Sequence, residues 1–208
     1  MIRDASRSER KLLDAGRAVL AESGLGGLRL RAVARRAGLN VGLFPYHFGT
    51  KRAFLRLLLQ ETYDEFFARL SRESAGDGPA DRRLRRALVT FGRFTRDQRR
   101  LFVALLAEAL QGDREVISYL EANVPRHAGL IGRLIAEGQR ARAFKALPAP
   151  VAVSFALGAM GAPNVMITAL ERCGGSAARR HLASWSEEFL SDRALERRAD
   201  LVLAALRS

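Results

Sequence analysis

Side chains suited to binding an anion gather near the N-terminus of this 208-residue chain. They are Arg29, Arg31, Tyr46, His47 and Lys51. An arginine fork can bind a guanine edge through two hydrogen bonds, while tyrosine, histidine and lysine suit phosphate oxygens. These residue types, gathered within one short segment, favour contact with nucleic acid.

The charge distribution supports the same interpretation. The first 56 residues hold twelve Lys and Arg against four Asp and Glu, whereas residues 57–208 hold 23 against 18. This excess at one end predicts a polyanionic partner, with nucleic acid favoured over an anionic membrane. A general preference for arginine over lysine explains the choice of cation but not its placement.

Catalytic and metal-binding motifs are absent from the sequence. It has no phosphate-binding glycine loop and no HExxH motif. Cys173 stands alone, and His47, His127 and His181 are far apart in sequence. We therefore expect no enzyme activity, no cofactor and no metal site. The N-terminus has no apolar signal-peptide region, which favours a cytoplasmic protein.

Helix signals run from end to end, and sustained strand alternation is absent. The apolar spacing and caps predict an all-α fold, with an N-terminal three-helix helix-turn-helix DNA-binding domain over residues 1–50 and a larger helical effector-binding and dimerisation domain over 51–208. The helices are expected at about 6–24, 29–37, 40–47, 50–74, 80–96, 98–111, 114–123, 126–143, 150–172, 177–190 and 192–207.

Residues 151–170 form an uncharged run that is long enough to cross a membrane. Pro163, Asn164 and several Ala and Gly residues interrupt its apolar character. We therefore expect a buried helix that packs closely against another helix. A helical protein of the membrane surface is the alternative.

The second and third expected helices are joined by Gly38-Leu39-Asn40-Val41, which is the arrangement of a helix-turn-helix. An ordinary helical hairpin is the alternative, but the basic segment favours DNA. Asn40 is a strong N-cap candidate for the third helix. Counted from Asn40, Pro45 is the fifth helical residue, so we expect it to remove one hydrogen bond to the carbonyl of Val41.

Residues 12–55, LLDAGRAVLAESGLGGLRLRAVARRAGLNVGLFPYHFGTKRAFL, closely resemble the N-terminal domain of tetracycline-repressor (TetR) family regulators. The resemblance is carried by Glu22-Ser23-Gly24, Val33-Ala34, Ala37-Gly38-Leu39-Asn40, Gly42, Tyr46-His47-Phe48 and Lys51. Residues 56–208 resemble the family mainly in length and helical content. The resemblance implies a homodimeric transcriptional regulator, most often a repressor that a small-molecule effector releases from a palindromic operator.

The family motif also assigns positions for DNA contact. Arg31 matches a residue that reaches a base edge, and Lys51 matches a lysine that contacts phosphate. The expected DNA-binding residues are Arg29, Arg31, Asn40, Val41, Gly42, Leu43, Pro45, Tyr46, His47 and Lys51. The sequence departs from the family at Leu28-Arg29, where a threonine pair is usual, and at Pro45, where tyrosine is common.

The effector cannot be identified from sequence, but apolar side chains between residues 84 and 170 provide enough surface to line a cavity. The expected ligand-binding residues are Phe91, Phe94, Phe102, Leu106, Tyr119, His127, Met160 and Asn164. Each apolar residue of this set, taken alone, suits a core position equally well.

We expect dimerisation through residues 150–172 and 190–207. A ligand-independent DNA-binding protein is the alternative.

Overall fold

The computed structural model describes residues 2–173, 175, 182 and 185–207, and the regular elements in these ranges are α-helices. They are α1 (Ile2–Gly27), α2 (Leu30–Ala37), α3 (Leu43–Phe48), α4 (Lys51–Ala75), α5 (Ala80–Asp97), α6 (Arg99–Leu110), α7 (Arg114–Arg140), α8 (Ala149–Cys173) and α10 (Asp192–Leu206). The expected all-α fold is confirmed. Of the helix expected over 177–190, residues 182 and 185–190 are described and helical, and the others lie outside the described residues.

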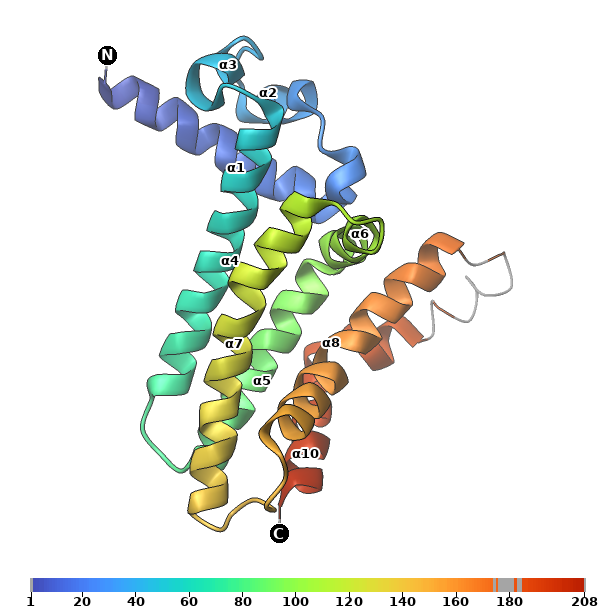
Figure 1. Ribbon diagram of the computed structural model, residues 1–208. Helices are drawn as coiled ribbons and strands as arrows, with labels where there is room; N and C mark the ends of the chain where they lie inside the picture. Colours follow the sequence, from blue (N-terminus) through green and yellow to red (C-terminus); the bar gives the residue numbers. More distant parts are fainter. Residues whose placement is uncertain (1, 174, 176–181, 183–184, 208) are drawn as a thin grey trace.

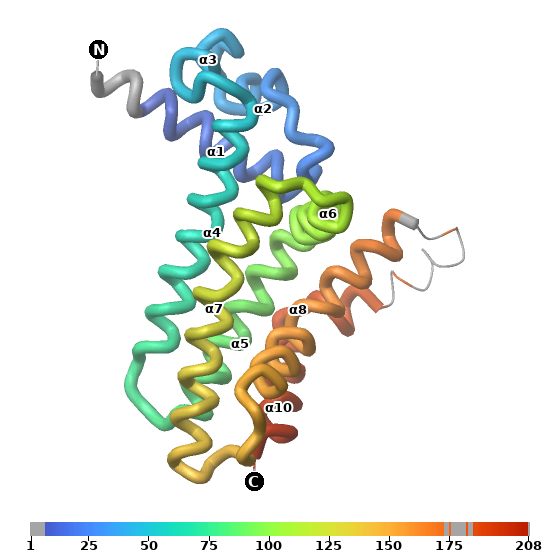
Figure 2. The backbone as a smooth tube through the Cα atoms, in the orientation of Figure 1, coloured from blue at the N-terminus to red at the C-terminus, as the bar shows by residue number. Residues whose placement is uncertain are grey.

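The molecule has a small head at one end and a longer helical body (Figure 1). The head consists of α1, α2 and α3, and the body consists of α4 to α8 with α10. Figure 2 shows how α4 leaves the head and runs along the body beside α7. Any movement of α4 relative to the body is therefore passed directly to the head.

Two separate groups of buried side chains stabilise these parts. The head cluster comprises Leu12, Leu13, Ala15, Val19, Leu20, Leu28, Val33, Ala34, Phe44, Phe54, Leu58, Leu59, Leu101 and Leu105. The larger body cluster is built mainly from α4, α5, α7, α8 and α10. Residues of α4 belong to both clusters, with Phe54 and Leu58 in the first and Tyr63 and Phe66 in the second. The fourth helix thus joins the two cores.

The first helix bends where the sequence predicts that it ends. Gly24 has φ 66° and ψ −171°, a backbone conformation that disfavours residues with a Cβ. The last three residues of α1 continue as a short turn beyond it. Leu28 then returns to the head core, where it is fully buried.

The two helices expected around Pro125 are a single helix, α7, so the predicted break was wrong. An interior proline costs about 3 kcal/mol because it removes one backbone hydrogen bond and crowds the preceding turn. Contacts on both sides hold the helix together here. Tyr63 Oη donates to the Asn123 carbonyl at 2.5 Å, and Asn123 Nδ2 donates to the Tyr119 carbonyl at 2.9 Å. Beyond the proline, Ile131 is fully buried.

One face of α8 is buried and the other is exposed. Ala152, Ala156 and Met160 pack into the body core. Among the described residues, α8 is the helix that is long and apolar enough to cross a membrane, and 33% of its apolar window is buried inside the protein. The expectation of close helix packing therefore holds for one face only.

Candidate nucleic-acid interface and ligand cavities

The turn between α2 and α3 is fixed by backbone geometry. Gly38 adopts the left-handed conformation, with φ 66° and ψ 33°, which glycine tolerates best. Its N–H donates to the Arg35 carbonyl at 3.2 Å, and the Leu39 N–H donates to the Ala34 carbonyl at 3.0 Å. These bonds end α2 and direct the chain toward α3.

The third helix begins later than the sequence predicts. Asn40 Oδ1 accepts a hydrogen bond from the Gly42 N–H at 2.8 Å, and the helix starts at Leu43 with Gly42 as its N-cap. Asn40 therefore stabilises the preceding turn and does not cap the helix itself. An asparagine side chain commonly stabilises a turn by accepting a hydrogen bond from the backbone N–H two residues later, and Asn40 does so here.

This later start changes the expected role of Pro45, which is the third residue of the helix and not the fifth. The Phe44 N–H donates to the Val41 carbonyl at 3.1 Å, so that carbonyl already has a partner. Nitrogen atoms in the first turn of a helix have no intrahelical acceptor in any case. The predicted loss of a hydrogen bond at Pro45 was therefore wrong, and the proline is compatible with the helix.

Aromatic packing holds α3 on the rest of the head. Phe44 is 3% exposed, and its ring meets the Phe54 ring edge-on at a centroid distance of 4.9 Å. The half-buried Phe48 packs against Phe54 at 4.8 Å. Because Phe54 belongs to α4, these contacts tie the orientation of α3 to that of α4.

The opposite face of α3 is open to solvent. Tyr46 is 74% exposed, and its ring contacts the half-buried His47 edge-on at 5.0 Å. Of the other predicted DNA-binding residues, Arg29, Arg31, Asn40, Val41, Gly42, Pro45 and Lys51 are exposed, and Leu43 is half-buried. The structure thus brings all ten together, on α2, the turn, α3 and the start of α4, at the end of the molecule remote from the C-terminus (Figure 1).

The cations of this surface are free to bind a ligand. Within the described ranges, the side chains of Arg29, Arg31 and Lys51 have no hydrogen-bond or ion-pair partner in the protein. Lys51 opens α4, directly after Thr50, whose hydroxyl accepts from the Ala53 N–H at 3.0 Å. The amides of a helix N-terminus carry partial positive charge, which adds to that of the lysine. The surface can therefore receive phosphate oxygens.

The predicted ligand-binding residues differ in burial and in the contacts that they make. Phe91, Met160 and Asn164 are buried, whereas Leu106 is 50% exposed. The Phe94 ring stacks on Phe66, and the Phe102 ring meets Phe94 edge-on. Tyr119 and His127 are half-buried on α7.

The buried side chain of Asn164 connects neighbouring helices in this structure. Its Nδ2 donates to Thr95 Oγ1 at 2.8 Å and to the Gly92 and Met160 carbonyls at 3.2 Å each. Its Oδ1 accepts from Arg198 Nη2 at 3.1 Å. These bonds join α5, α8 and α10 and satisfy a buried amide that would otherwise be costly.

His127 belongs to a second buried polar group, between α4 and α7. Its Nδ1 lies 3.1 Å from Tyr63 Oη. Because the Tyr63 hydroxyl donates its proton to the Asn123 carbonyl, His127 Nδ1–H must be the donor in this contact. Burial lowers the pKa of His127 to about 4, partly opposed by a hydrogen bond with the Asn123 backbone. Burial also raises the pKa of Tyr63 to about 12. Both side chains are therefore neutral near pH 7.

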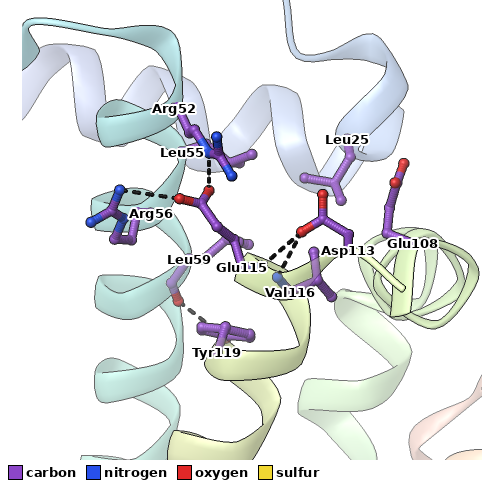
Figure 3. A pocket seen from close by; sticks show the side chains of 10 residues that line it. All are labelled: Leu25, Arg52, Leu55, Arg56, Leu59, Glu108, Asp113, Glu115, Val116 and Tyr119. Atoms are coloured by element: carbon purple, nitrogen blue, oxygen red, sulfur yellow. Dashed lines mark hydrogen bonds and ion pairs between the residues drawn. The ribbon is translucent and has the colours of Figure 1, made fainter. Parts of the chain in front are cut away.

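Two of the cavities beside α4 contain predicted ligand-binding residues. One, of about 270 Å³, lies where the head meets the body and is lined by Leu25, Arg52, Leu55, Arg56, Leu59, Glu108, Asp113, Glu115, Val116 and Tyr119 (Figure 3). The other, of about 530 Å³, is more polar and is lined by residues of α1, α4 and α5 with Gln98. Of the predicted ligand residues, Tyr119 lines the first and Phe94 lines the second.

Sequence reasoning missed the other residues of the first cavity. They come from four helices, and neither apolar spacing nor a motif distinguishes them from ordinary surface or core positions. Asp113 carried a local signal, because it caps α7 by accepting from the Glu115 and Val116 N–H groups at 2.9 and 3.0 Å. That signal marks a helix start and not a cavity.

The body also has an exposed apolar surface. It consists of Val151, Phe155, Met166 and Leu170 on α8 and Leu201 on α10, which are between 37% and 63% exposed. These two helices are those that the sequence predicts for dimerisation. Large apolar side chains that are exposed on neighbouring helices can mark an interaction site.

Comparison with known proteins identifies the N-terminal segment. Residues 12–58 match the model of the family described as "Bacterial regulatory proteins, tetR family". The chain is 32% identical over 79 residues to the HTH-type transcriptional regulator BetI of Burkholderia thailandensis, a match that covers 38% of this chain and 40% of BetI. The chain thus aligns with about two-fifths of the length of this relative.

Solved structures share the fold over nearly the whole chain. A transcriptional regulator FadR from Bacillus subtilis, in complex with stearoyl-CoA, has a TM-score of 0.68 at 18% identity and covers 96% of this chain and 97% of its own. A regulator from Saccharomonospora viridis, in complex with choline, has a TM-score of 0.69 at 19% identity, with coverages of 88% and 96%. At such identities the likeness concerns the fold alone.

Proposed function

We propose that this chain is a transcriptional regulator, a repressor that binds a palindromic DNA operator as a homodimer and is released by a small-molecule effector; the match of residues 12–58 to the tetR family model supports this proposal. The observation that carries the proposal is the exposed face of α3, with Tyr46 at its centre and the unpaired side chains of Arg29, Arg31 and Lys51 around it.

In the proposed complex, α3 enters the major groove. Arg31 reads a base edge, because its guanidinium is exposed and has no partner among the described residues. Lys51 and the first amides of α4 hold a backbone phosphate, which positions the head without reading sequence. The rings of Phe44, Phe48 and Phe54 hold α3 in this orientation.

The exposed apolar surface of α8 and α10 supports a homodimer. Two copies of this surface, related by a two-fold axis, would form a four-helix interface and remove Phe155 and Met166 from water. A dimer with two heads requires two inverted half-sites, and hence a palindromic operator.

We also propose that the chain divides near residue 50, with the DNA-binding unit before it and the dimerisation and effector unit after it. The separate head and body clusters support this division, although Phe54 and Leu58 of α4 complete the head core. The bound stearoyl-CoA and choline of the two structural neighbours support a ligand-responsive body.

Binding-site selection with the purified protein, followed by anisotropy titrations, tests DNA recognition. We expect an inverted repeat whose affinity falls steeply with salt, because phosphate contacts release counterions. Lys51→Ala should weaken binding to all sequences, whereas Arg31→Ala should also relax the preference at one base pair, by about 1–3 kcal/mol. Arg140→Ala, at the far end of α7, is the control. Selection of no enriched site would refute the proposal.

Light scattering tests the dimer. The wild type should be dimeric at micromolar concentration, and Phe155→Glu should give monomers that bind the palindrome weakly, because a buried charge disfavours the interface. Glu171→Gln, on the same helix, provides a control for general effects of charge. A wild type that is monomeric at this concentration would contradict the proposed assembly.

A further inference from the structure

The cavity at the junction of head and body has a floor suited to an apolar group. Leu25 comes from the end of α1, Leu55 and Leu59 from α4, and Val116 and Tyr119 from α7 (Figure 3). Tyr119 Oη already donates to the Leu59 carbonyl at 3.3 Å. The floor therefore offers carbon surface and the face of an aromatic ring.

The two cations at the edge of this cavity share one carboxylate. Glu115 forms an ion pair with Arg52 Nε and a second with Arg56 Nη2, the latter at 3.3 Å. Figure 3 shows this carboxylate between the two guanidinium groups. Glu115 therefore offsets one of the two positive charges, and an anionic ligand would have to compete with it.

The anions at the other edge are not neutralised. The lining contains three carboxylates against two guanidinium groups, although the whole chain carries a net charge of +13. Asp113 Oδ1 is engaged by two backbone N–H groups. Within the described part of the chain, the Glu108 carboxylate has no partner. The available charge beside the apolar floor is therefore negative.

We propose that this cavity binds a small amphipathic organic cation, with its apolar part on Leu55, Leu59 and Val116 and its charge beside Glu108 and Asp113. The face of Tyr119 adds a cation–π surface. A volume of about 270 Å³ lies just below the range of about 300–1,000 Å³ that is typical of sites for drug-sized molecules, so the ligand is smaller than those.

The position of the site gives binding a regulatory consequence, which rests on the proposed function. Arg52 and Arg56 lie in the first two turns of α4, next to Lys51. In the described conformation Glu115 engages both, which reduces the positive charge available to DNA phosphates. A ligand that binds this conformation preferentially stabilises it and therefore lowers DNA affinity.

Calorimetric titration of the full chain with benzyltrimethylammonium, and with phenylacetate as the anionic counterpart, tests the site. The wild type should bind the cation and not the anion. Val116→Trp should abolish binding by filling the cavity, and Glu108→Lys should weaken it about tenfold by placing like charge beside the ligand. Glu121→Lys makes the same change of charge on an exposed part of α7 outside the cavity and should bind like the wild type.

The outcomes separate this proposal from the proposed function. A wild type that does not bind the cation, or a Glu108→Lys variant that binds it as well as Glu121→Lys does, would overturn the site. Anisotropy titrations with the selected operator then measure coupling, and cation binding should lower DNA affinity in the wild type but not in Val116→Trp. Normal cation binding without DNA binding would refute the regulator instead. Cation binding that leaves operator affinity unchanged would remove the regulatory consequence.

Discussion

The head and the body of this protein use their arginines in different ways. In the body, arginines bind carboxylates on neighbouring helices, as in Arg83–Glu137, Arg85–Asp200, Arg93–Asp192, Arg96–Asp192, Arg126–Asp64 and Arg207–Asp81. In the head, Arg29, Arg31 and Lys51 have no such partner among the described residues. The body cations serve mainly to connect helices. Arg17 and Arg36 of the head are likewise paired, with Glu65 and Glu22, so it is Arg29, Arg31 and Lys51 that remain available to an external anion.

Ion pairs also connect the surroundings of Lys51 with α7. Arg52 and Arg56 follow Lys51 in α4, but both pair with Glu115 of α7. The number of cations near Lys51 that are available to DNA therefore depends on where α7 lies. Charge composition alone predicts the class of partner, whereas the ion pairs within the protein determine which cations are available to bind that partner.

The largest expected effect comes from neutralising the free cations together. The triple variant Arg29→Ala, Arg31→Ala, Lys51→Ala should lose about a hundredfold in DNA affinity at moderate salt, with a smaller salt slope, because up to three phosphate or base contacts are removed. Anisotropy titrations at several salt concentrations measure both quantities.

A triple variant of the body provides the matched control. Arg85→Ala, Arg93→Ala, Arg207→Ala removes the same charge from side chains that are paired with carboxylates. Distant charges are screened over about 10 Å at 0.1 M salt, so its DNA affinity should stay close to that of the wild type. Equal losses in the two variants would show that net charge, and not free cations of the head, governs binding.

The buried His127 of the body sharpens the comparison through pH. Burial lowers the pKa of His127 to about 4. Between the unfolded value near 6.5 and this folded value, the unfolded chain binds a proton that the folded chain does not. Stability therefore falls as the pH falls through this window, by roughly 2 kcal/mol between pH 7 and pH 5.

Urea unfolding at both pH values measures this loss. His127→Gln should remove most of it. An acid-induced loss of the same size in His127→Gln would assign the effect to other groups.

Arg83 tests the connecting role of the body cations. Its Nε donates to the Ser74 carbonyl at the end of α4 and its Nη1 to Glu137 of α7, both at 2.7 Å. Arg83→Ala should lower the free energy of unfolding by roughly 1–2 kcal/mol, because two partly buried acceptors lose their donor. Arg82→Ala, at the exposed neighbouring position, should stay within about 0.5 kcal/mol of the wild type. Equal stabilities of the two variants would contradict a connecting role.

The sequence predicted the fold well because its local signals agreed with the packing. Thr50 caps α4 and Gly38 ends α2 as expected. The break predicted at Pro125 was wrong, because α7 continues through the proline in a region where Tyr63, which is distant in sequence, donates to the Asn123 carbonyl. Such long-range contacts leave no trace in a local pattern.

The two candidate sites differed in how far the sequence could predict them. The predicted DNA-binding residues lie within one short segment, so a motif defines them, and the structure places them on α2, the turn, α3 and the start of α4. The cavity at the junction draws residues from α1, α4, α6 and α7 and from the turn before α7, and only the packing of these helices brings Leu25 close to Val116. The apolar residues predicted for the effector, such as Met160, were chosen by hydrophobicity, which equally describes a core.

The smallest effect is expected at Pro45, where the family commonly has tyrosine. Because the Val41 carbonyl already accepts from Phe44, Pro45→Tyr regains no hydrogen bond. The variant also loses the restriction that proline imposes on the unfolded chain, so its stability should fall by less than about 1 kcal/mol.

The DNA-reading surface should nevertheless change at Pro45→Tyr. Pro45 is exposed beside Tyr46, and a tyrosine there adds a second hydroxyl to the face that meets DNA. We expect the preferred half-site to shift while non-specific affinity stays equal or rises. Binding-site selection on the wild type and on Pro45→Tyr measures the shift, with melting temperatures as the check on folding. Identical selected sites would show that the proline does not contribute to sequence recognition, and the specificity of the head would then rest on Arg31 and on the residues of α3 around Pro45.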